Sequence, residues 1–219
     1  MILESVILAH GSLDLLFFRR LEDVVLYVLI IYLYNFFLII NPSIGLLTFI
    51  LFGSQHFGDF LKSESHARKI MKGALIISST YFTTNGPKIW GKYLVELDFP
   101  REKIIHVNFL LTNINTITGI GCLFIYGKKS FFPFFFMMAT VMITDLENFI
   151  ILYFMIVHIP VSIYRSSKKF GKKCYITIPS VPICYLFLNS IPWNINLLRL
   201  MISISFSHIL LHAGILKNI

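Results

Sequence analysis

Seven histidines are the residues of this chain whose type and placement could do chemistry. Two of them, His66 and His106, lie in or beside charged stretches and are typical of solvated positions. The other five lie within long apolar runs, at His10, His56, His158, His208 and His212. Ionisable side chains are costly in apolar segments of a membrane and usually serve a function there. Imidazole binds iron, zinc, copper and nickel, so one metal ion would give these histidines a common partner.

The distance of these five histidines from the next basic residue favours the metal interpretation. Each of them precedes an arginine or a lysine by five to nine residues. At a helical rise of 1.5 Å per residue, they would lie about 8 to 14 Å from one membrane boundary. Any one of them alone would fit equally well a packed, hydrogen-bonded histidine between helices. Because four different segments place imidazole at one depth, the pattern indicates a shared site.

Two local spacings refine this hypothesis. Asp14 follows His10 by four residues, on the same helical face, where its carboxylate could accept the second N–H of the imidazole. His208 and His212 are also four residues apart, so one helix could offer two nitrogens to one ion.

The composition excludes most other classes of protein. Of the 219 residues, 56% are hydrophobic and only 14% are charged, and the mean hydropathy is +0.76. Soluble domains carry roughly a quarter charged residues. We therefore expect an all-α, polytopic transmembrane helical bundle of about seven to nine segments, in a single domain over residues 1–219. The net charge of +8 is explained by basic loops on one side of a bilayer, and no nucleic acid is expected as a partner.

The apolar runs predict where these segments lie. They cover residues 2–18, 24–40, 44–61, 70–86, 105–126, 131–146, 148–164, 175–191 and 197–216. A polar loop is expected over 87–104. The stretch 131–164 would be about 50 Å long as one helix, too long for a single crossing, so we expect a break near Asp145.

The charges of the intervening loops predict the orientation. If nine segments alternate, the basic stretches at 19–20, 62–72, 128–129 and 165–173 all fall on one face. Basic loops face the cytoplasm. This arrangement predicts a multi-pass protein of the plasma membrane with its carboxyl terminus on the cytoplasmic side.

Four short strings around the histidines resemble motifs of the Brp/Blh family of membrane β-carotene dioxygenases. In order, they are AHGSLD at 9–14, SQHFGD at 54–59, VHIPVSIYR at 157–165 and SHILL at 207–211. The strings come in the order of the family motifs and extend over nearly the whole chain. Two positions depart from the motifs, because Ala9 replaces a proline and Ser162 stands where the third motif carries a second histidine.

The resemblance implies an integral-membrane enzyme that holds Fe(2+) through histidines. It would use O₂ to split the central 15,15′ double bond of membrane-dissolved β-carotene into two molecules of retinal, which a rhodopsin could accept. His10, His56 and His158 match ligand positions of the motifs. His208 or His212 could replace the ligand that Ser162 does not supply; alternatively, water completes a site with three protein ligands.

Two other functions remain open on the sequence. The serine at position 162 also fits a non-catalytic family member that binds carotenoid or retinal without cleaving it. A small metal or proton transporter could use intramembrane histidines as a pathway. It would require carboxylates throughout the depth of the bilayer, whereas Asp14 is nearly the only one in the apolar segments.

Overall fold

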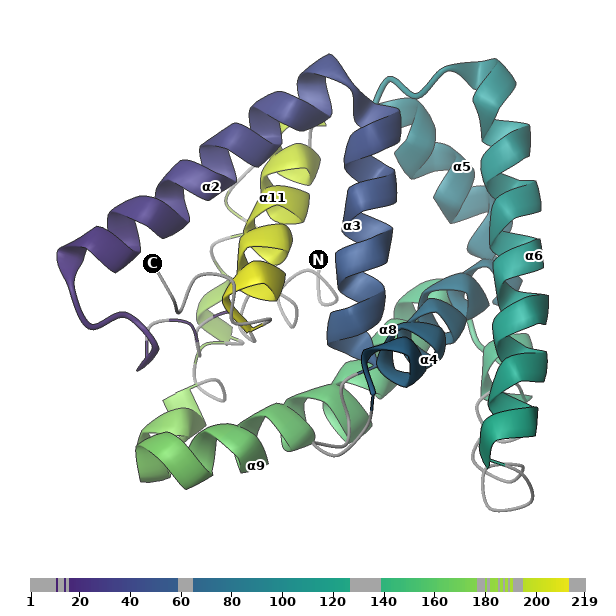
Figure 1. Cartoon of the computed structure of the whole chain (residues 1–219). Coiled ribbons are helices and arrows are strands. Elements are labelled where there is room, and N and C mark those ends of the chain that lie inside the picture. The colour runs from purple at the N-terminus through teal and green to yellow at the C-terminus, as the bar shows by residue number, and fades with distance from the viewer. Residues whose placement is uncertain are drawn as a thin grey trace. The chain divides into compact units, whose positions relative to one another are not determined.

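The computed structural model of the chain describes residues 11, 14, 16–58, 65–126, 139–176, 180, 182–184, 186, 188, 190 and 195–212. All regular elements of these residues are helices, and no strand occurs among them (Figure 1). The expected all-α class is therefore confirmed for the described part of the chain. The chain forms two compact units, one of residues 1–41 with 151–219 and one of residues 42–150. The predicted segment 2–18 lies largely outside the described residues, and about half of each of the predicted segments 131–146 and 175–191 lies outside them.

The first unit is built around two apolar helices that pack along each other, α2 (Leu21–Ile40) and α11 (Ile195–His212). The amino-terminal end of α2 is capped by Asp23, whose carboxylate accepts hydrogen bonds from the backbone N–H groups of Arg19 and Arg20 at 2.8 and 3.0 Å. The same unit contains the π-helical turn η3 (Phe154–His158), α9 (Ile159–Phe170) and the 3₁₀ helix η4 (Gly171–Ile176).

The π-helical turn has a local cause in the sequence. Pro160 lacks an N–H group, so the ladder of i→i−4 hydrogen bonds is interrupted there. One residue earlier, the N–H of Ile159 donates to the carbonyl oxygen of Phe154, five residues back. Single π turns of this kind are rare and occur frequently at functional sites. The turn places His158 at its carboxyl-terminal end.

The second unit contains α3 (Pro42–Phe57), α4 (His66–Ser79), the 3₁₀ turn η2 (Thr80–Phe82), α5 (Gly86–Glu96) and α6 (Arg101–Tyr126). The contact between α3 and α4 is made backbone to backbone at two glycines. A Cβ atom on Gly73 would lie 1.7 Å from the carbonyl oxygen of Ser54, and one on Gly58 would lie 1.7 Å from that of Lys69. Small residues that allow such close approach are typical of helix pairs in membranes.

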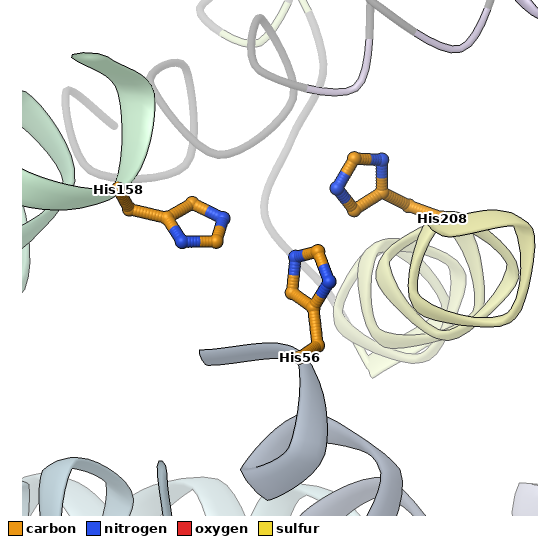
Figure 2. A group of neighbouring side chains, drawn as sticks. All are labelled: His56, His158 and His208. Atoms are coloured by element: carbon orange, nitrogen blue, oxygen red, sulfur yellow. The ribbon is translucent and has the colours of Figure 1, made fainter. Parts of the chain in front are cut away.

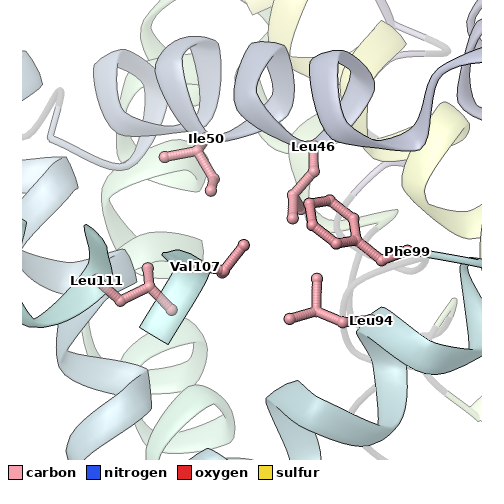
Figure 3. Close-up of a cluster of buried hydrophobic side chains, with 6 residues drawn as sticks. All are labelled: Leu46, Ile50, Leu94, Phe99, Val107 and Leu111. Carbon is pink, nitrogen blue, oxygen red and sulfur yellow. The ribbon is translucent and has the colours of Figure 1, made fainter. Parts of the chain in front are cut away.

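Two kinds of contact hold the remaining helices of this unit together. A hydrophobic cluster joins α3, α5 and α6 and consists of Leu46, Ile50, Leu94, Phe99, Val107 and Leu111 (Figure 3). Between α4 and α6 the contact is polar, because the buried amide of Asn115 donates to the hydroxyl oxygens of Ser78 and Ser79 at 3.3 and 2.9 Å. Interhelical hydrogen bonds of this kind are a common link between helices in membranes.

The structure both confirms and corrects the predicted segments. The expected break near Asp145 is present, since α8 (Leu146–Tyr153) begins there and the Asp145 carboxylate accepts the N–H of Asn148 at 2.8 Å. The expected loop over 87–104 is wrong, because α5 occupies most of it. Among the described residues, two helical stretches are long and apolar enough to cross a membrane, Leu21–Ile40 and Leu146–Lys173, and a shorter apolar helix covers Leu198–His212.

Candidate metal centre

Most of the sequence-predicted site residues lie in the first unit. His158 ends the π-helical turn, Ser162 lies one helical turn later in α9, and His208 and His212 lie near the end of α11. His56 belongs to the second unit, in the last turn of α3. His10 lies outside the described residues, so its assignment as a ligand stays a prediction.

Within the first unit, His158 and His208 approach each other from two helices. Their ligand nitrogens lie within 4.8 Å of one another, and their side chains point toward a common space (Figure 2). His158 is 5% exposed and His208 is 6% exposed. The ring of Tyr153 stacks on that of His158 with centroids 5.9 Å apart, which restricts how the imidazole can turn. Figure 2 also draws His56, whose participation in the same site stays a prediction.

Asp14 connects the two histidines of α11. Its carboxylate is 2% exposed, and its Oδ1 lies 2.7 Å from Nδ1 of His208 and 3.2 Å from Nε2 of His212. Its other oxygen, Oδ2, accepts a hydrogen bond of 2.7 Å from the hydroxyl of Tyr27 in α2. The structure places Asp14 against His208 and His212. Its predicted contact with His10 involves a residue outside the described part of the chain and stays a prediction.

The donor set fits a transition metal. In this unit, the ligand nitrogens of His158 and His208 lie within 4.8 Å of each other. The ligand atoms of Asp14, His208 and His212 also lie within 4.8 Å of one another. Imidazole nitrogens with a carboxylate nearby suit Fe(2+), Zn(2+) and Cu(2+) rather than Mg(2+) or Ca(2+), which prefer oxygen ligands. The residues present are therefore compatible with the predicted iron.

Tyr27 is a member of this site that the sequence did not predict. A tyrosine within an apolar helix is common, because its ring is apolar and its hydroxyl can find a partner. Its contact with Asp14 spans thirteen positions of the chain, including the non-helical residues 18–20 that precede α2. No helical spacing connects the two residues, so periodicity gave no signal for this contact.

The environment of His212 differs from that of His208. Its ring meets the edge of Phe17 at a centroid distance of 5.0 Å, and Phe17 in turn contacts Phe170 at 5.0 Å. The ammonium of Lys169 lies 5.1 Å from the centre of the Phe17 ring. His212 therefore lies at the margin of the site, between Asp14 and an aromatic cluster near a basic helix end.

Comparison of the chain with protein-family models, with curated proteins and with solved structures gave no match.

Proposed function

We propose that this chain is a multi-pass integral-membrane enzyme that cleaves the central double bond of a carotenoid with O₂, using Fe(2+) held by histidines. The observation that carries the proposal is the approach of two buried imidazoles, His158 and His208, within 4.8 Å in a strongly apolar chain. The predicted ligands His10 and His56 would complete the site. The resemblance of the histidine motifs to the Brp/Blh family supports the choice of substrate.

Each part of the site has a role in this reaction. Fe(2+) with open coordination positions would supply the activation of O₂. His158 and His208 would hold the ion, and Asp14 would fix the orientation of His208. The apolar surroundings would exclude water from the reacting alkene. Both atoms of O₂ would become the aldehyde oxygens of the two products, so a symmetric C40 hydrocarbon would give two molecules of retinal.

The surface of α2 suits a hydrocarbon substrate that is dissolved in the bilayer. Tyr32, Leu33 and Phe36 are 58 to 70% exposed on this helix, which is one of the two long enough to span a membrane. Apolar side chains on such a helix are stable when they face lipid. We place the protein in the plasma membrane with its carboxyl terminus in the cytoplasm, on the basis of its basic loops.

Expression in bacteria that make β-carotene tests this function. We expect the orange colour to fade and retinal to accumulate. The His158→Ala variant should retain the colour, whereas His106→Ala, which changes an exposed histidine of α6, should behave like the parent chain. Persistent colour without retinal, despite good expression in the membrane, would count against the proposal.

A second function is favoured by one observation, the serine at position 162. If Ser162 deprives the site of a needed ligand, the protein would bind carotenoid or retinal without cleaving it. Co-purification of pigment with the parent chain, together with no gain of cleavage in Ser162→His, would favour this alternative.

A further inference from the structure

Asp14 determines which nitrogen of His208 can bind a metal. An ionised carboxylate only accepts hydrogen bonds. The Asp14 carboxylate contacts three potential donors, Tyr27, His208 and His212, which is the arrangement expected of the ionised form. At 2.7 Å from Oδ1, the Nδ1 of His208 must therefore carry the proton. In the neutral imidazole the lone pair is then on Nε2.

This arrangement distinguishes His208 from His212, which the sequence left equivalent. His208 is grouped with His158 through ligand atoms within 4.8 Å, whereas His212 is grouped only with Asp14 and His208 among the described residues. His212 uses Nε2 toward Asp14, and its ring lies against Phe17. His212 is thus placed to support the carboxylate, and His208 is placed to reach the ion.

We infer that His208 binds the metal through Nε2 beside His158, and that Asp14, held by Tyr27 and His212, is the positioning residue that fixes its tautomer. The inference rests on the proposed metal-dependent function and names the ligand that Ser162 does not supply. Carboxylate–histidine–metal arrangements of this kind fix the ring orientation, and loss of the outer carboxylate typically weakens metal binding about 10- to 100-fold.

The first test counts coordinated imidazoles in the full chain, purified in detergent and loaded with Cu(2+), by electron spin-echo spectroscopy. We expect His208→Ala to lose one coordinated imidazole. His212→Ala and the exposed control His106→Ala should keep the number of the parent chain. An unchanged number in His208→Ala, or a loss in His212→Ala, would overturn the assignment.

The second test separates a positioning role of Asp14 from direct ligation. Asp14→Leu removes the acceptor, and we expect an affinity for Fe(2+), measured by chelator competition, about 10- to 100-fold lower with an unchanged number of imidazoles. Asp14→Asn retains an acceptor oxygen and should restore part of the affinity. Complete loss of metal in both variants would show that Asp14 is itself a ligand and would overturn the positioning role.

The third test needs no metal and covers the case in which Asp14→Leu does not fold. In the metal-free parent chain, ¹⁵N spectra of labelled histidine should show His208 protonated at Nδ1. Tyr27→Phe, which removes only the hydroxyl, should lower the population of that tautomer. A proton on Nε2 of His208 in the parent chain would overturn the inference.

If the parent chain binds no metal at all, the proposed function fails together with the ligand assignment. Metal binding that is insensitive to His208→Ala refutes only the ligand assignment.

Discussion

The ring of Tyr34 in α2 lies flat against the ring of Phe206 in α11, with centroids 3.8 Å apart and ring planes 9° apart. Both side chains are buried. Phe206 precedes His208 by two residues, and Tyr34 lies two helical turns after Tyr27. The stacked pair therefore sets the position of α11 against the helix that supports Asp14.

Replacing this aromatic contact should loosen the proposed metal site. We expect Phe206→Ala to lower the free energy of unfolding by about 3–5 kcal/mol, because a buried ring leaves a cavity. Affinity for Fe(2+) should fall as well, since α11 loses its fixed position. Denaturant unfolding in detergent and chelator competition measure the two effects. Phe109→Ala, at a position that is 71% exposed in α6, is the matched control and should change neither quantity.

The close contact of α3 and α4 predicts a large difference between two glycine substitutions. In Gly73→Ala the new methyl group would collide with the backbone carbonyl of Ser54, so the two helices must separate and the second unit should lose stability. In Gly91→Ala nothing lies within 4 Å of the new methyl group, and helix propensity should stabilise α5 by about 1 kcal/mol. Thermal unfolding of both variants checks this. Equal stability of the two would contradict the backbone contact.

Introducing histidine at position 162 should strengthen the proposed metal site. Residue 162 lies in a helix four positions after His158, a spacing at which two side chains can reach one ion. We expect Ser162→His to add one coordinated imidazole. The affinity for Fe(2+) should rise at least about tenfold, which is the smallest effect typical of residues that only hydrogen-bond a ligand. Spin-echo counting and chelator competition provide the measurements. An unchanged count would show that residue 162 faces away from the site.

The π-helical turn predicts an unusual effect for Pro160→Ala. The substitution restores an N–H group, so the turn can revert to α-helix, and an interior proline that costs about 3 kcal/mol is removed. Reversion changes the register by one residue, which rotates α8 by about 100° relative to α9. We expect thermal stability to be maintained or raised while metal affinity falls. Loss of both quantities together would indicate simple unfolding.

The sequence predicted best what local patterns determine. The apolar run 24–40 became α2, the run 105–126 lies within α6, and Asp145 marks the predicted break. The region 87–104 misled because its charged side chains suggested a polar loop. In the structure, Pro87 lies in the first turn of α5, and the buried Leu94 packs into the hydrophobic cluster. Where polar and apolar residues alternate without a clear pattern, tertiary packing thus determined that a helix forms.

The candidate site was predictable only in part, because several of its contacts depend on tertiary packing and not on local spacing. The common depth predicted from the sequence included His158 and His208 among five histidines, and the structure brings these two together. The partner of Asp14 could not be found from spacing, because an i,i+4 pattern identifies neighbours on one helix and His208 lies 194 positions away. Tyr27 was missed because its role depends on one hydroxyl that meets a carboxylate from another segment.

The glycine contact between α3 and α4 also bears on how the protein would enter a bilayer during its synthesis. The two helices have 16 and 14 residues, about 24 and 21 Å at the helical rise, so each is shorter than a hydrocarbon core of about 30 Å. A single short helix would expose polar backbone ends to lipid. In the proposed multi-pass protein, helices held this closely would therefore leave the translocation channel as one hairpin rather than one after the other.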